Sequence, residues 1–116
     1  MDTTHTADHP VDPTAAVVWI DRRHALVARS QAGRHEVREV AREIDRDAQY
    51  LLRVAHEASD CERILIMGPD ELRLAFEREY VALYRRPDRL VDSAAEIEPG
   101  PPRLVDRLRF LEFPLD

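Results

Sequence analysis

The sequence predicts an α/β protein with a mixed five-stranded sheet, in the element order β-β-β-α-β-α-β-α. Short apolar, β-branched runs predict strands, and later in the chain they alternate with segments whose apolar residues recur every three or four positions. Such strand–helix–strand crossovers imply parallel neighbours with right-handed connections. The 116 residues are 44% hydrophobic, enough for a single packed core.

The first half begins with a polar segment without periodicity, residues 1–14, which we expect to be a flexible tail before a single domain over residues 15–116. Residues 15–20 (AAVVWI) predict a buried strand that contains Trp19. After a tight turn at Asp21, residues 24–29 predict the returning strand of a hairpin. Gln31 to Gly33 predict a second turn, because glycine adopts positive φ without a steric penalty.

Residues 35–59 allow two interpretations. Their apolar residues recur at helical steps, which favours one long helix. Alternatively, residues 35–41 form a third strand and the helix begins near Arg46. Two strands make a poor sheet by themselves, so we favour the strand.

The second half contains clearer boundaries. Residues 63–67 (RILIM) predict a buried strand that Gly68 and Pro69 end, with Pro69 in the first position of a helix that reaches about Arg86. Residues 90–97 predict another strand. A last helix follows Pro102, and an apolar stripe marks each of the two helices: Leu72, Phe76, Tyr80 and Leu83, then Leu104, Val105, Leu108 and Leu111.

Charge and cysteine content narrow the class of protein. The net charge is -6, and all 17 basic residues are arginine. An acidic chain argues against non-specific nucleic-acid binding driven by counterion release. Acidic residues interleave with the arginines between Arg22 and Arg46, which predicts a salt-bridged solvent face. The single cysteine, the absence of a membrane-length apolar run and the polar N-terminus predict a cytoplasmic protein without membrane association.

Candidate reactive groups do not form a recognised catalytic pattern. We interpret His24, His35 and His56 as surface or capping side chains, and we interpret the spacing of His5, Asp8, His9 and Asp12 in the tail as chance. Cys61 lies between Asp60 and Glu62, whose charges raise the pKa of a thiol. We therefore expect no catalytic residue, no metal and no cofactor.

Two turns allow a functional alternative. The turn from Gly68 to Glu71 follows a central strand, where a phosphate could bind, but Pro69 lacks an N–H and two acidic residues follow it. Asp21 follows the first strand, as a metal-binding carboxylate does in ribonuclease-H-like nucleases. Such nucleases need several converging carboxylates, and Asp21 is equally well explained as a turn residue.

Most of the chain resembles the middle domain of archaeal and eukaryotic peptide-release factors and of Pelota. It resembles most of all the small bacterial, release-factor-like relatives of that domain. The resemblance is carried by two stretches, AVVWIDRRHALVAR and YLLRVAHEASDCERILIMGPDELRLAFEREY, and by the strand and helix that follow them. The resemblance covers roughly residues 15–112. In that family the Gly-Pro turn is usually followed by a glycine and then a basic residue; here Asp70 replaces the glycine and Arg73 is the basic residue. The resemblance implies a ribonuclease-H-like fold, similar to ribosomal proteins L18 and S11.

Release factors of this family present a Gly-Gly-Gln loop between the early strands and the first long helix. This chain has only Gly33, Gly68 and Gly100, so it contains no such triplet, and Gln31 precedes Ala32 in the corresponding region. The resemblance therefore implies a non-catalytic, translation-associated module that binds the ribosome or tRNA. Candidate contacts are Arg22, Arg23, Arg34, Arg38 and Arg73, and candidate loop-site residues are Asp21, Gln31, Gly33, Gly68 and Pro69.

Two alternatives remain at this point. One is a protein-interaction or homo-oligomerising domain without an RNA partner, which would pair through the strand at residues 90–97. The other is the ribonuclease-H-like nuclease considered above.

Overall fold

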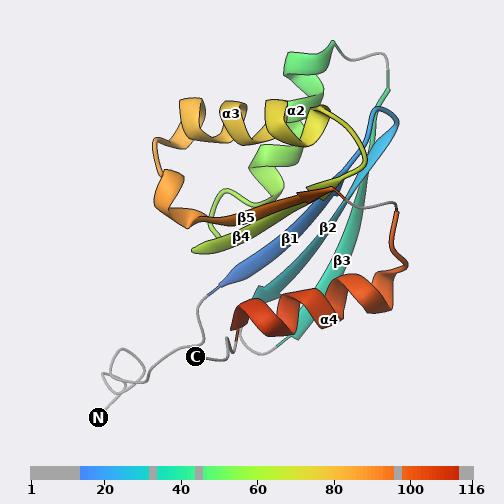
Figure 1. Cartoon of the computed structure of the whole chain (residues 1–116), viewed down its shortest axis with the longest axis vertical. Coiled ribbons are helices and arrows are strands. Elements are labelled where there is room, and N and C mark those ends of the chain that lie inside the picture. The colour runs from blue at the N-terminus through green and yellow to red at the C-terminus, as the bar shows by residue number, and fades with distance from the viewer. Residues whose placement is uncertain (1–13, 32–33, 44–45, 96–97, 113–116) are drawn as a thin grey trace.

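The computed structural model describes residues 14–31, 34–43, 46–95 and 98–112, and it confirms the predicted order of strands and helices (Figure 1). One sheet has the strand order β3-β2-β1-β4-β5. The first three strands are antiparallel neighbours, whereas β4 and β5 run parallel to β1, as the crossovers predicted. The strands are β1 (Ala15–Ile20), β2 (His24–Gln31), β3 (Arg34–Ala41), β4 (Arg63–Gly68) and β5 (Leu90–Ala95).

Helices cover both faces of this sheet. Helices α2 and α3 lie on one face and α4 lies on the other, which gives three layers (Figure 1). The buried side chains accordingly form two clusters, one on each side of the sheet. The helices are α2 (Asp47–Glu57), α3 (Leu72–Tyr84) and α4 (Pro101–Glu112), with a short 3₁₀ helix, η1 (Pro87–Arg89), before β5.

The position of β1 in the middle of the sheet explains its uninterrupted apolar sequence. It pairs with β2 on one side and with β4 on the other, and helices cover both of its faces. All six of its residues are therefore buried, including Trp19, which confirms the prediction that this tryptophan belongs to the core. Trp19 packs on the α4 side of the sheet, whereas Val18 and Ile20 pack against α2 and α3.

Residues 34–41 form strand β3, which confirms the strand interpretation of the ambiguous segment. In the described sheet β3 pairs only with β2, so it is an edge strand. Most of its side chains are exposed, and Val40 is the buried exception. Charged side chains are typical of edge strands, where they oppose pairing with further chains. Helix α2 then begins at Asp47, beside the predicted start at Arg46.

The junction between β4 and α3 differs from the prediction. Helix α3 begins at Leu72, and the Glu71 carbonyl accepts a hydrogen bond from the Ala75 N–H at 3.1 Å. The Asp70 carboxylate accepts the Leu72 N–H at 2.9 Å. The prediction that Pro69 is the first helical residue is therefore wrong: Pro69 lies in the bend between strand and helix, because Asp70 provides the hydrogen-bond acceptor at the helix start.

Of two further predictions, the apolar stripe of α3 changes at one residue, and the strand predicted at residues 90–97 is confirmed as far as Ala95. Leu72, Phe76 and Tyr80 are buried as predicted, but Leu83 is 41% exposed. Strand β5 ends at Ala95, and the last two residues of the predicted strand, 96–97, lie outside the described residues.

At the N-terminal edge of the sheet, β1 and β4 begin side by side. The Thr14 carbonyl accepts the N–H groups of Glu62 at 2.9 Å and Arg63 at 3.2 Å. The Arg29 guanidinium donates to both oxygens of the Asp60 carboxylate, at 3.1 and 3.0 Å. These contacts hold the chain in place where the sheet starts; residues 1–13 of the predicted tail lie outside the described residues.

Cys61 is fully buried at this edge. Burial and then the Asp60 charge raise the pKa of the Cys61 thiol to about 11. The predicted direction is confirmed, although burial is the larger cause. A thiol with this pKa is almost entirely protonated at neutral pH and is a poor nucleophile.

Candidate functional site at the C-terminal edge of the sheet

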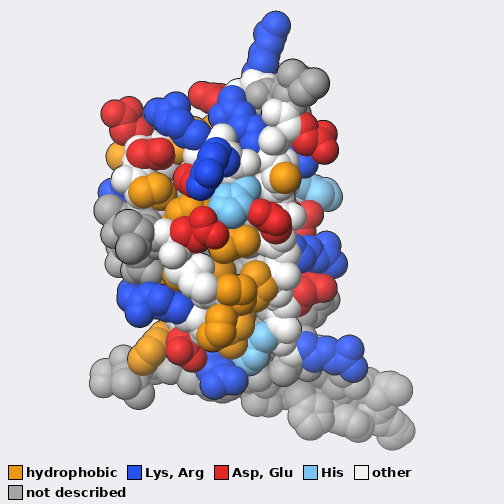
Figure 2. All heavy atoms as spheres, turned by 90° about the vertical axis from the view of Figure 1, so that its right-hand side faces the viewer, with side chains coloured by type: hydrophobic (Ala, Val, Ile, Leu, Met, Phe, Trp, Pro, Cys, Tyr) orange, Lys and Arg blue, Asp and Glu red, His pale blue; other side chains and the backbone are white. Residues whose placement is uncertain are grey.

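The three parallel strands end together at one edge of the sheet. Strands β1, β4 and β5 end at Ile20, Gly68 and Ala95, and the segments that follow place Asp21, Asp70 and Glu98 beyond them. We call this region the C-terminal edge. Figure 2 views the side at the right of Figure 1 and shows a histidine between acidic side chains, with arginine side chains above it. In open α/β sheets, ligands bind beyond the carboxyl ends of the strands.

Asp21 organises the turn between β1 and β2. One of its carboxylate oxygens accepts the N–H groups of Arg23 at 2.8 Å and His24 at 2.9 Å. Its own N–H donates to the His24 carbonyl at 3.0 Å. From helix α2, the Tyr50 hydroxyl donates to the Asp21 carbonyl at 2.9 Å. Asp21 is thus a turn residue, and its position is held from two sides.

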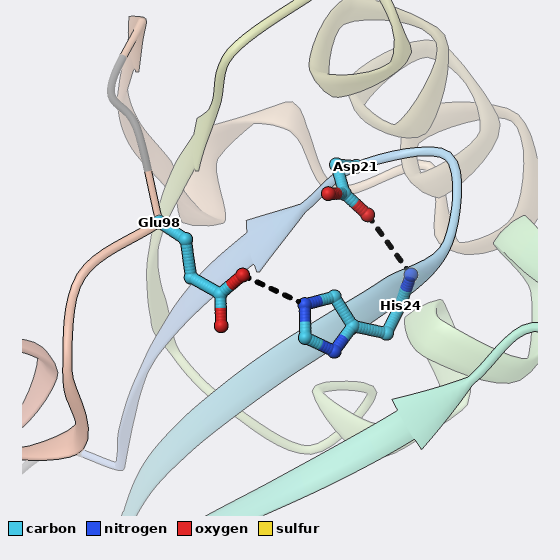
Figure 3. Close-up of side chains that lie close together, drawn as sticks. All are labelled: Asp21, His24 and Glu98. Carbon is cyan, nitrogen blue, oxygen red and sulfur yellow. Dashed lines mark hydrogen bonds and ion pairs between the residues drawn. The ribbon is translucent and has the colours of Figure 1, made fainter.

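His24, the first residue of β2, lies between two carboxylates. Its Nδ1 contacts a carboxylate oxygen of Glu39 on β3, and its Nε2 lies 3.0 Å from Glu98 (Figure 3). The Trp19 ring meets the imidazole edge-on, with 5.5 Å between ring centroids. The side chain of His24 is only 18% exposed, so the interpretation of His24 as an isolated surface or capping residue is wrong.

The surroundings of His24 favour the positive form of its imidazole. Burial by itself lowers the pKa of His24, but the hydrogen bonds to Glu39 and Glu98 outweigh it. The charges of Glu98 and Asp21 act in the same direction as these hydrogen bonds. The pKa of His24 therefore lies above its ordinary value of 6.5.

Gly68 allows β4 to approach the end of β1 closely. A Cβ atom at this position would lie 2.3 Å from the Ile20 carbonyl oxygen, so only glycine fits. Next to it, Arg22 from the β1–β2 turn lies 3.7 Å from the Asp70 carboxylate, and Arg73 donates to the Asp70 carbonyl at 3.3 Å. The Arg22–Asp70 contact joins the two neighbouring turns.

The candidate residues named from the sequence do not form one site. Those at the C-terminal edge are Asp21, Arg22, Arg23, Gly68, Pro69 and Arg73. Gln31 and Arg34 pair at the opposite end of the β2–β3 hairpin, and Gly33 lies outside the described residues. Arg38 lies along β3, where it forms ion pairs with Glu36 and Glu57, as expected for a salt-bridged face.

Sequence reasoning missed the histidine–carboxylate cluster. In the β2–β3 register Leu26 is opposite Glu39, which makes His24 and Glu39 diagonal neighbours on one face of the hairpin. The hairpin register would therefore have suggested this first pair. Glu98 is 74 residues further along the chain than His24, and no sequence pattern connects them.

Two hollows border this cluster. One, of about 260 Å³, is lined by Arg23, His24, Glu39 and Ala41. A larger one, of about 660 Å³, lies between the end of β3 and α2, and its lining includes Leu52 and Arg53. Glu39 lines both hollows, but of the two only the smaller is lined by His24 itself, so the smaller one bears on the chemistry of the cluster.

Comparison with known proteins gives the fold a context. No protein-family model and no curated protein sequence matches the chain. Among solved structures, an archaeal translation termination factor, aRF1, matches 96% of this chain with a TM-score of 0.65 and 13% identity. Pelota from Archaeoglobus fulgidus matches 86% of the chain (TM-score 0.61, 13% identity), and Pelota from Thermoplasma acidophilum matches 92% (TM-score 0.60, 18% identity).

The chain shares its fold with one part of each of these proteins. It spans only 37%, 32% and 37% of the lengths of these three proteins, so the similarity concerns a portion of each. The resemblance expected from the sequence is thus confirmed as a structural likeness. Separately, none of the described helices combines the length and the apolar composition that crossing a membrane requires.

Proposed function

We propose that this chain is a translation-related module that binds the ribosome or tRNA and does not hydrolyse peptidyl-tRNA. The observation that carries the proposal is the fold match to aRF1 over 96% of the chain, repeated with two Pelota proteins. The likeness of the fold to ribonuclease H and to ribosomal proteins L18 and S11 is part of the same proposal. A cytoplasmic location follows from it.

The proposed lack of hydrolysis rests on the sequence. Gly33, Gly68 and Gly100 are all far apart, so no glycine pair can bring the backbone close to an ester. Gln31 is the remaining group of the candidate loop that could orient a water molecule. Purified protein added to ribosome-bound peptidyl-tRNA should release no peptide above background. Release that disappears in Gln31→Ala would contradict this part of the proposal.

The exposure of the arginines favours the β1–β2 turn as the contact surface. The side chains of Arg22 and Arg23 are 65% and 83% exposed. Arg38 lies closer to its acidic partners, at 3.2 Å from Glu36 and 3.4 Å from Glu57, than Arg22 and Arg23 lie to theirs at 3.7 and 3.9 Å, which reduces its capacity to bind phosphate relative to theirs. Because the whole chain carries a net charge of -6, association must depend on such a local group of arginines.

Sedimentation with ribosomes tests this proposal. Tagged full-length protein should co-sediment with ribosomes at moderate salt, and Arg22→Ala/Arg23→Ala should lose most of the co-sedimenting fraction. The matched control, Arg78→Ala/Arg109→Ala, removes two exposed positive charges from α3 and α4 and should behave as the unmodified chain. Absence from ribosomal fractions during both growth and starvation would refute the proposal.

A second function has its own support. The net charge of -6 and the arginines paired with acidic residues are compatible with a protein-interaction or oligomerising domain that has no RNA partner. Strand β5 is an edge of the sheet and could pair with a second copy. Light scattering across micromolar concentrations distinguishes the two: a constant monomeric mass would exclude self-association in that range.

A further inference from the structure

Three potential metal ligands meet at the C-terminal edge, two from the β1–β2 turn and one from a distant segment of the chain. Asp21 follows β1, His24 begins β2, and Glu98 lies between β5 and α4 (Figure 3). One ligand atom from each of the three residues lies within 4.8 Å of the other two. A metal ion that drew them together would need only small side-chain movements, because metal–ligand bonds in proteins are about 2 Å long.

We propose that Asp21, His24 and Glu98 bind one divalent transition-metal ion of the Zn²⁺ type, with the Nε2 of His24 and one carboxylate oxygen from each acidic residue as ligands. The site does not depend on the proposed role in translation. An imidazole with two carboxylates suits Zn²⁺ and its first-row neighbours, whereas Mg²⁺ and Ca²⁺ prefer oxygen ligands alone. Three protein ligands leave at least one coordination position for water or a ligand atom.

Glu39 provides an independent reason for this assignment. Histidines that ligate metals almost always donate the N–H of their other ring nitrogen to a carboxylate or carbonyl, which fixes the ring and its tautomer. Here Nδ1 of His24 faces the Glu39 carboxylate, and Nε2 faces Glu98. A bound ion would displace the proton from Nε2, while the proton on Nδ1 stays with Glu39, so Nε2 becomes the ligand atom. The Trp19 ring further restricts rotation of the imidazole.

Asp21 and Glu98 differ in ways that suit a preformed but accessible site. Two backbone N–H groups hold one oxygen of Asp21, and the side chain is only 14% exposed. Among the described residues, the other oxygen forms a loose ion pair, at 3.9 Å, with the highly exposed Arg23. Glu98 is 44% exposed, so an ion can enter from solvent on its side. Together with Glu39, the carboxylates of Asp21 and Glu98 carry more negative charge than the two positive charges of the proposed ion.

An ion at this position would connect the β1–β2 turn to the segment that enters α4. His24 and Glu98 are 74 residues apart in sequence, so the ion would cross-link two distant parts of the chain in the folded state only. Ligands that bind only the folded state raise its stability in proportion to the logarithm of their concentration. We therefore expect Zn²⁺ to raise the unfolding temperature of the full chain.

The test is a Zn²⁺ titration of the full-length, EDTA-treated chain. Calorimetry against a competing chelator measures the affinity and the number of ions bound, and thermal unfolding measures the stabilisation. We expect one ion per chain, at least 100-fold weaker binding in Glu98→Gln and His24→Asn, and a tenfold to hundredfold loss in Glu39→Gln. Glu98→Gln is the decisive variant, because its exposed side chain leaves the core unchanged. Mg²⁺ should bind far more weakly than Zn²⁺.

The control variant is His5→Asn/His9→Asn, which removes the two histidines that lie closest together in the sequence and leaves His24 in place. It should bind Zn²⁺ as the unmodified chain does. Three results would overturn the proposal: no saturable binding, unchanged binding in Glu98→Gln, or loss of binding only in the His5→Asn/His9→Asn variant.

Discussion

The N-terminal edge and the C-terminal edge, where the parallel strands begin and end, use charged side chains in different ways. At the N-terminal edge Arg29 and Asp60 form a matched pair beside the fully buried Cys61. At the C-terminal edge one imidazole, His24, shares two carboxylates, and Asp21 adds a third nearby. In the first arrangement the positive charge of Arg29 and the negative charge of Asp60 balance each other. The second places three carboxylates around one imidazole, and the proposed metal site rests on this difference between the two edges.

The largest expected effect concerns the close approach of strands at the C-terminal edge. In Gly68→Ala the new Cβ would lie 2.3 Å from the Ile20 carbonyl oxygen, and pairing of β1 with β4 leaves that backbone little room to move. We expect a loss of about 3 kcal/mol in the free energy of unfolding, measured by urea denaturation. The control Gly100→Ala, whose Cβ would lie 3.7 Å from Pro102, should cost less than about 1 kcal/mol. Equal losses would contradict the steric explanation.

The next prediction concerns the closed N-terminal edge. Burial raises the pKa of Cys61 from 9.0 to about 11, so at pH 8 the folded chain should contain about 100-fold less thiolate than the unfolded chain. Alkylation by iodoacetamide should be slower by at least that factor, with the chain in urea as the control. Because the folded state holds its proton more tightly, stability should fall as the pH rises from 9 towards 11. Rapid alkylation of the native chain would show that this edge opens.

A smaller effect is expected for the hydrogen bond that holds the β1–β2 turn. Tyr50→Phe removes the hydroxyl that donates to the Asp21 carbonyl at 2.9 Å and leaves that carbonyl without this partner. The free energy of unfolding should fall by about 1–2 kcal/mol. Tyr84→Phe keeps the ring that packs 4.9 Å from Tyr80 and should change it by less than about 0.5 kcal/mol. If both variants lose the same amount, the hydroxyl of Tyr50 does not stabilise the turn.

The smallest effect concerns the ion pair at the N-terminal edge. The Arg29 side chain is 16% exposed but that of Asp60 is 57% exposed, so solvent weakens their attraction. A double-mutant cycle with Arg29→Met and Asp60→Asn should give a coupling energy of about 0.5–1 kcal/mol. The coupling should shrink in 1 M salt, because ions screen exposed charges. A coupling that is unaffected by salt would indicate a buried pair instead.

Local sequence patterns were enough for most of the fold. The uninterrupted apolar runs of β1 and β4 predicted strands, because buried parallel strands have this composition, and the Gly-Pro junction predicted where β4 ends. The strand predicted at residues 35–41, against their helical periodicity, is β3 at residues 34–41; the reason for the prediction was that a two-stranded sheet is a poor structure by itself. The start of α3 was misplaced because Pro69 suits a first helical position, whereas the Asp70 side chain moved the start to Leu72.

Tertiary structure alone decided which functional groups meet. Asp21 was visible in the sequence as the residue after the first strand, but its neighbour Glu98 comes from the connection between β5 and α4. Four of the five candidate arginines were close in sequence, yet β2 carries Arg34 to the opposite edge from Arg22. The reason is geometric: local patterns depend on neighbours within a turn or two, whereas the crossovers between parallel strands bring distant segments to one edge and separate adjacent ones by the length of a strand.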